Sequence, residues 1–306
     1  MKKLGYTEFR KHFDQIFDGV DRTHTIAHQL VDLTDLFQKI SAIYAFGREH
    51  QNSSLQNPII FQIVESALRY GICIPIRRLA DGSQKNEVSL FRLVNEIRSN
   101  CEFWTRENFV TWDGKPYDPA ELVAEHRRKE AEIIREHMAR GESAFWLPIG
   151  EHEEVFRRHS LFDLLSGTSA EDRTKEDRWT GRLAGYLLRT LDSGSKDVVY
   201  FANTYLAHRV LFPPDRQPQY KTPLAAIERS IVSLWQCFNV LNSIFRDSQM
   251  TPDIVHSLQS FDNLHLALVA KESEQSMIDG YEAVKKRMAE AANNHANNWQ
   301  HDFMNS

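Results

Sequence analysis

The stretch 24-HTIAHQLVDLTDLFQKISAIYAF-46 decides the fold class of this chain. Its apolar residues recur at spacings of three, four and seven, and polar residues fill the positions between them. The apolar residues are Ile26, Leu30, Leu33, Leu36, Phe37 and Ile40. This period matches the 3.6 residues of a helical turn rather than the two-residue alternation of a half-buried strand. The stretch therefore predicts an amphipathic helix with one buried face.

The same helical period recurs along most of the 306 residues. It is seen in residues 6–20, 58–81, 88–110, 119–141, 179–194 and 224–245. No convincing strand pattern and no internal repeat interrupts these segments. The sequence therefore predicts an all-α fold, a multi-helix bundle.

Several local signals predict where this helical pattern is disturbed. Pro75 lies inside a helical stretch and predicts a kink, since proline lacks the N–H that an inner helical turn needs. A Ser-Gly-Ser sequence at 193–195 predicts a break between two helices. Residues 142–167 have a less regular pattern, and the charged stretch 168–179 is typical of a solvated linker or of the first turn of a helix. The Asn-rich segment 292–303 predicts a frayed end.

Composition limits the class of protein. Hydrophobic residues make up 42% of the chain, enough for a sizeable core. The net charge of −5 means that any nucleic-acid site must be a local groove or loop rather than a general basic surface. Three cysteines without a CxxC pair fit a reducing cytoplasm. No apolar run is long enough for a membrane span, and no secretory signal is expected.

Two groups of histidines and carboxylates have spacings that metal sites also use. His24 and His28 are four residues apart, but no acidic partner completes an HExxH-type set. The second group is Glu151, His152, Glu154 and His159. Because arginines at 157 and 158 accompany it, we expect a salt-bridged surface there. No metal or other cofactor is predicted, and P-loop, GxSxG and GxGxxG motifs are absent from the sequence.

Ribonuclease chemistry without a metal needs a base for the 2′-hydroxyl and a cation for the phosphorane. Histidine suits the first task because its pKa is near neutrality, and arginine suits the second because it is permanently charged. In 201-FANTYLAHR-209, His208 follows Asn203 by five residues and Ala202 by six, and Arg209 follows directly. The alternative is that His208 is simply the polar end of a helix before a proline-rich connection.

Two upstream segments have structural interpretations. Arg77 and Asp81 are four residues apart and are expected to form an intrahelical ion pair. Arg106, Glu107, Asp113, Tyr117 and Asp118 are expected to fasten the turn 111-TWDGKPYD-118 against the bundle. A role facing a ligand is the alternative for these loop residues.

Three segments taken together resemble a known family. They are 76-IRRLADGSQKNEVSLFRLVNEI-97, 105-TRENFVTWDGKPYD-118 and 200-YFANTYLAHR-209. Their order and spacing resemble the AbiU2-like branch of the HEPN superfamily, known from bacterial abortive-infection and toxin-type proteins. The resemblance implies an α-helical HEPN-like domain at 1–250, followed by a C-terminal helical extension at 251–306.

The resemblance also implies function. HEPN proteins of this kind are usually homodimers in which the Arg/His motifs of two protomers face a shared cleft, and active members cleave RNA without a metal. His208 matches the motif histidine and Asn203 the polar position, whereas Ala202 stands where the family has arginine. The cation is then expected from Arg209 or from residues elsewhere. The expected phosphate or cleft contacts are Arg77, Arg78 and Tyr205.

A non-catalytic role is the alternative that the sequence leaves open. A degenerate HEPN-like module would bind RNA, a nucleotide or a protein partner such as an antitoxin in the same cleft without cleavage. Ala202 and the negative net charge favour this alternative.

Overall fold

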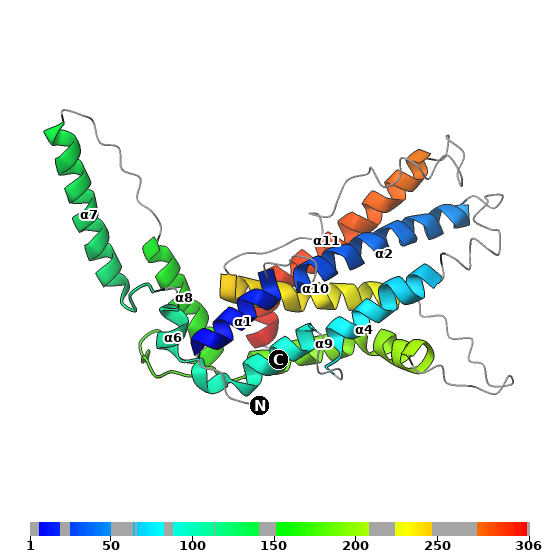
Figure 1. Ribbon diagram of the computed structural model, residues 1–306, viewed down its shortest axis with the longest axis horizontal. Helices are drawn as coiled ribbons and strands as arrows, with labels where there is room; N and C mark the ends of the chain where they lie inside the picture. Colours follow the sequence, from blue (N-terminus) through cyan, green and yellow to red (C-terminus); the bar gives the residue numbers. More distant parts are fainter. Residues whose placement is uncertain are drawn as a thin grey trace. The chain divides into compact units, whose positions relative to one another are not determined.

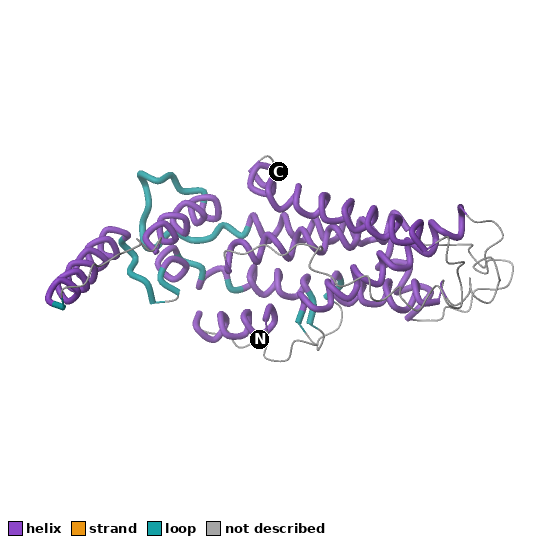
Figure 2. Tube along the Cα trace, turned by 90° about the horizontal axis from the view of Figure 1, so that it is seen from above, coloured by secondary structure: helices purple, strands orange, loops and turns teal. Residues whose placement is uncertain are grey.

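Helices dominate the structure, a computed structural model that describes most of the chain. The described residues are 6–18, 25–49, 64, 66–82, 88–112, 114–140, 151–207, 224–246 and 274–304. Within them the regular elements are helices and no strand occurs, which confirms the predicted all-α, multi-helix class (Figures 1 and 2). None of the helices in these ranges is long and apolar enough to cross a membrane.

The chain divides into two compact units. The first unit comprises residues 1–11 and 97–183, and the second comprises residues 12–96 and 184–306. The C-terminal helix α11 (Glu274–Met304) belongs to the second unit, where it packs against the helices formed by residues 26–49 and 224–246. The HEPN-like assignment of residues 1–250 stays a prediction.

Three long helices build the second unit: α2 (Ile26–Glu49), α10 (Leu224–Arg246) and α11 pack against one another (Figure 1). The apolar stripe predicted for α2 is buried, except that Leu36 is half-buried. Trp235 Nε1 of α10 donates a hydrogen bond to Thr34 Oγ1 of α2 at 2.8 Å, and both residues are fully buried. The buried indole N–H thus has a partner, as such groups require.

Helix α11 continues through the Asn-rich segment to Met304, where the sequence predicted fraying. Its earlier turns are anchored by the buried side chains of Tyr281, Met288 and Ala292. Once packing has fixed those turns, each further residue adds one backbone hydrogen bond, and the helix does not have to be nucleated again.

Helix α9 (Arg182–Phe201) runs without interruption through the Ser-Gly-Ser sequence, so the predicted break is wrong. Ser195 Oγ donates to the carbonyl of Leu191 within the same helix at 2.5 Å. A Cβ atom at Gly194 would lie 2.5 Å from Ser233 Cβ of α10. The glycine is therefore a close-packing position between two helices, and not a helix breaker.

The predicted disturbance at Pro75 is a change of helix type. A π-helical segment, η3 (Arg69–Cys73), precedes α4 (Ile74–Ala80), and Pro75 lies in the first turn of α4. A proline cannot donate to the carbonyl four residues before it and crowds that group. The wider π turn places this crowded position at the start of a new α-helical segment, where a missing N–H is tolerated.

Besides α9, whose first two residues belong to the first unit, α1 (Tyr6–Asp18) and α5 (Leu90–Ser99) contain residues of both units. Within the second unit, the ring of Phe13 from α1 lies 4.5 Å from the ring of Phe245 in α10. This aromatic contact joins α1 to the buried surface of the bundle.

The first unit contains shorter elements, and its central helix is α8. These elements are η4 (Cys101–Phe103), α6 (Arg106–Val110), α7 (Pro119–Ala139) and α8 (Glu151–Ser166). Helices α6 and α7 both contact α8. The buried stripe of α8 has helical spacing but includes Arg158 and His159, both nearly inaccessible to solvent. Polar residues at core positions explain why the sequence pattern there looked irregular.

Candidate functional site

Asn203 lies at a second irregular point of the second unit. Directly after α9 the chain continues as a π-helical segment, η5 (Ala202–Ala207). Arg77 of α4 donates a short hydrogen bond from Nε to Asn203 Oδ1, across 126 residues of sequence. π-helical segments are rare in proteins overall, but those that occur are often found at functional sites. The structure therefore brings together two of the residues singled out in the sequence.

The packing of the surrounding helices explains the contact between Arg77 and Asn203. Both η3 and α4 pack against η5, and α4 and α9 run in opposite directions (Figure 1). Ala202 is completely buried. The position at which the family resemblance expects an arginine is thus part of the core, while a guanidinium reaches the neighbouring Asn203 from another helix.

The partner of the half-buried Arg77 guanidinium decides how far its charge is compensated. Its observed partner is a neutral amide, and no carboxylate among the described residues pairs with it. The predicted ion pair with Asp81 is not formed; the backbone N–H of Asp81 donates to the Arg77 carbonyl instead, at 2.8 Å. An amide fixes the orientation of the guanidinium without neutralising it. The charge stays available for an anion such as a phosphate.

The other predicted site residues are distributed as follows. Arg78 is exposed on α4. His208 and Arg209 lie outside the described residues, as does the side chain of Tyr205. The assignments of a catalytic base, a second cation and a cleft contact at these positions stay predictions.

The histidine and carboxylate groups considered for metal binding have other contacts where they are described. Glu154 pairs with Lys115 and Arg158. Burial opposes ionisation of Glu154, but the hydrogen bonds and charges of these two cations outweigh it and lower its pKa. His159 Nε2 donates to the carbonyl of Tyr117 at 2.9 Å. In the described part of the chain, no three His, Cys, Asp or Glu side chains are arranged to hold a metal.

The expected salt bridges near α8 are thus confirmed, but Arg158 is buried rather than part of an open surface. His24 and the side chain of His152 lie outside the described residues.

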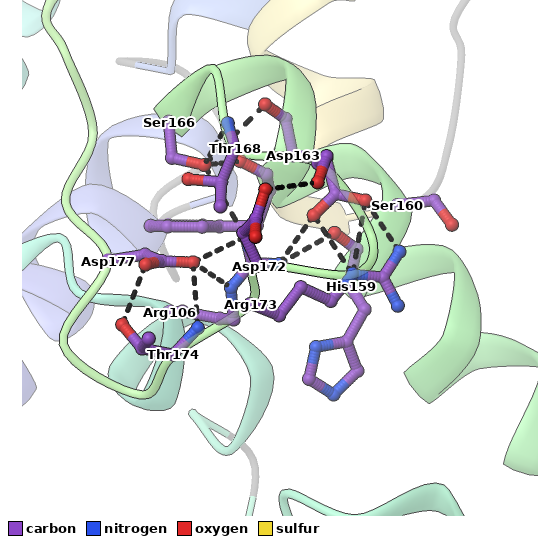
Figure 3. A network of polar contacts seen from close by, with 12 residues as sticks. Arg106, His159, Ser160, Asp163, Ser166, Thr168, Asp172, Arg173, Thr174 and Asp177 are labelled. Carbon is purple, nitrogen blue, oxygen red and sulfur yellow. Dashed lines mark hydrogen bonds and ion pairs between the residues drawn. The ribbon is translucent and has the colours of Figure 1, made fainter.

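A larger polar cluster surrounds Arg106 in the first unit (Figure 3). Arg106 is fully buried at the start of α6. Its Nε donates to Asp177 Oδ2 at 2.8 Å, and its Nη1 lies 2.8 Å from Asp163 Oδ1 of α8. Nη1 also donates to the carbonyl of His159 at 3.0 Å, and Nη2 to Ser166 Oγ at 3.4 Å.

The carboxylates of this cluster are held from their other sides as well. Arg173 Nε donates to Asp163 at 3.0 Å, and the hydroxyl of Thr174 donates to Asp177 at 2.7 Å. Burial raises the pKa of Asp177, but the hydrogen bonds from Thr174 and Arg106 more than offset this and lower it. Every nitrogen of the Arg106 guanidinium has a protein acceptor, so this cluster fastens α6 to α8 and to the following loop and leaves no donor for a ligand.

The turn at 111–118 is fastened in a similar way. The Trp112 ring lies 3.7 Å from the guanidinium carbon of Arg10 and 5.2 Å from that of Arg158. Gly114 has a φ of 86°, a conformation that favours glycine. Asp118 Oδ1 accepts from the backbone N–H of Ala120 and caps α7. The fastening predicted for this turn is confirmed for Tyr117, whose carbonyl accepts from His159 Nε2 of α8. The contacts of Arg106 fasten α6 to α8, and that of Asp118 caps α7. Glu107 lies 3.5 Å from Lys175, and Asp113 is outside the described residues.

Sequence reasoning missed three members of the Arg106 cluster: Asp163, Arg173 and Asp177. The latter two belong to the charged stretch that was interpreted as a solvated linker. Opposite charges alternating through 171–178 were the available signal. A charged loop of this composition can equally remain in solvent, so the pattern did not identify the buried partner.

Comparison with known proteins identifies no relative: no family model, no curated protein and no solved structure matches this chain. The function must therefore be argued from the chain's own residues.

Proposed function

We propose that this chain is a HEPN-like protein of bacterial defence or toxin–antitoxin type that cleaves RNA without a metal ion. The observation that carries the proposal is the contact between Arg77 and Asn203, because it adds a cation to the segment that precedes His208. The motif resemblance points to the histidine, and the proposed cation is Arg77, whose guanidinium donates to a neutral amide.

The roles follow from the chemistry of RNA transesterification. His208 takes the proton of a 2′-hydroxyl, and the freed oxygen attacks the adjacent phosphorus. The P–O5′ bond breaks, which leaves a 2′,3′-cyclic phosphate and a 5′-hydroxyl that takes up a proton. Arg77 stabilises the charge that develops on the phosphorane oxygens, and Asn203 holds the guanidinium in place. Arg209 is a second candidate cation, and a homodimer would bring two such motifs to one cleft.

Cleavage of single-stranded RNA by the pure protein in EDTA tests the proposal. We expect products that end in 2′,3′-cyclic phosphate, no cleavage by His208→Ala, and a loss of about 100- to 1,000-fold in rate for Arg77→Ala, typical of removing a charge-stabilising donor. Arg77→Lys should recover part of the rate. Arg135→Ala, which removes an exposed arginine of α7, is the matched control and should cleave normally. Full activity of His208→Ala would show that the site is wrong.

A catalytically degenerate module is the second candidate, and the burial of Ala202 favours it, since the family arginine has no equivalent at its own position. Such a module would bind RNA, a nucleotide or a protein partner and release RNA uncut. Bound RNA recovered at full length after incubation would support this candidate over the enzyme.

A further inference from the structure

Two exposed tyrosines accompany the Arg77–Asn203 contact. Tyr70 is 60% exposed on η3, and Tyr200 is 64% exposed in the last turn of α9. Single exposed apolar residues are common and need no explanation. These two, however, lie on elements that adjoin the same half-buried cation, since η3 packs against η5 and α9 leads directly into η5.

Their positions along the helices place them on opposite sides of that cation. Tyr200 precedes Asn203 by three residues, about 4.5 Å along a helix axis. Tyr70 precedes Arg77 by seven residues, about 10 Å along its axis. Figure 1 shows that α4 and α9 run in opposite directions. The positions of Tyr70 and Tyr200 along the chain therefore fall on opposite sides of the Arg77–Asn203 contact along the helix axes.

The charges nearby suit a phosphate backbone. The described partner of Arg77 is a neutral amide, which does not compensate the positive charge of the guanidinium. Lys196 is exposed one helical turn before Tyr200, so the two share a face of α9. The neighbouring acid, Asp197, pairs with Arg229 Nη2 at 3.4 Å. Lys196 is thus the charge nearest to Tyr200 on this face, and the exposed Asp192 lies one turn beyond Lys196, farther from Tyr200.

We infer that Tyr70 and Tyr200 stack against the bases of single-stranded RNA on either side of the phosphate that Arg77 contacts. The inference rests on the proposed function and adds two residues that bind its RNA. Unpaired bases offer their faces to aromatic side chains, whereas those of a duplex are already stacked. Each nucleotide also brings its own phosphate to Arg77. A protein partner would have to supply a matching carboxylate.

Binding to an RNA that cannot be cleaved tests this separately from catalysis. The probe is a labelled single strand of about 12 nucleotides with 2′-O-methyl groups throughout, followed by fluorescence anisotropy. Tyr70→Ala and Tyr200→Ala should each raise Kd roughly 5- to 100-fold, and the double variant more. The corresponding Phe variants should stay within about twofold, because the ring is kept. Phe156→Ala removes a 52% exposed aromatic of the first unit and is the matched control.

The outcomes separate the two proposals. If the tyrosine variants lose affinity while the parent protein never cleaves natural RNA, the stacking surface stands and the enzymatic proposal fails. If cleavage depends on His208 but the double tyrosine variant, folded by circular dichroism, binds as tightly as the parent, the stacking surface is wrong. Absence of any RNA binding by the parent would overturn it too. So would tyrosine variants that change the oligomeric state while RNA affinity is unaltered, since this would indicate a protein interface.

Discussion

Replacing Arg106 by methionine should loosen the first unit more than any other single charge removal in its polar cluster. Methionine fills much of the same volume but removes a fully buried guanidinium that contacts Asp163, Asp177, Ser166 and a backbone carbonyl. Removing one partner of a buried ion pair costs about 3–5 kcal/mol, because the opposite charge is left uncompensated.

The structure argues for the lower end of that range. Asp163 keeps the guanidinium of Arg173, and Asp177 keeps two hydrogen bonds from Thr174. Neither carboxylate is completely buried, with side-chain exposures of 18% and 11%. We therefore expect a loss of about 3 kcal/mol, a factor of roughly 100 in the local opening equilibrium.

Amide hydrogen exchange of α6 measures this loss without assuming that both units unfold together. The N–H groups of Arg106 and Glu107 donate to the carbonyls of Asp177 and Lys175 at 2.9 and 3.1 Å, so their protection reports directly on the fastening. Arg173→Met is the matched control. Its side chain is 25% exposed, and the expected loss is about 1 kcal/mol or less.

Neutralising both carboxylates should compensate for the missing guanidinium. In the Arg106→Met background, Asp163→Asn with Asp177→Asn is expected to restore part of the protection, since no unmatched charge is then buried. If Arg106→Met lowers protection no more than Arg173→Met does, Arg106 does not hold α6 against α8.

Two further predictions concern stability. Gly194→Ala should lower the free energy of unfolding of the second unit by about 1–3 kcal/mol in urea, because the added methyl group overpacks against Ser233. Gly185→Ala in the same helix is the control and should be neutral or stabilising, since the nearest atom would be 3.6 Å from the new Cβ. Equal effects of the two variants would contradict the close-packing role of Gly194. Burial lowers the pKa of His159, and the hydrogen bond to the Tyr117 carbonyl offsets this only in part, so the first unit should lose stability as pH falls below about 6.5. His159→Gln keeps an N–H donor and should flatten that dependence between about pH 7 and 5 in tryptophan-monitored urea unfolding; an unchanged slope would assign it to other groups.

The helical class could be predicted because the signals for each helix, its apolar period and its capping residues, lie within its own sequence. The stripe of α2, from Ile26 to Ile40, encodes both the period and the buried face within a few turns of chain. The first turn of α7 is similarly local, with Asp118 as the capping residue and Pro119 directly after it.

The continuity of α9 and the buried face of α8 could not be predicted in this way. Gly194 looks like a breaker until the neighbouring helix is known, and its meaning changes once Ser233 occupies the space that a side chain would need. Arg158 and His159 look like surface residues because their partners come from other segments of the chain.

The candidate site shows the same division between local and long-range information. By itself, the sequence determined that Asn203 lies five residues before a histidine and that Ala202 lies directly before Asn203. Only the tertiary structure decided that Arg77, 126 residues earlier, donates to Asn203. It also decided that Arg106 is fully engaged by two carboxylates, a hydroxyl and a carbonyl. The physical reason is that helix formation depends on neighbours within one turn. Whether the charge of a cation is compensated by a carboxylate, or remains open to a ligand, depends on the acceptors that packing brings to it from distant parts of the chain.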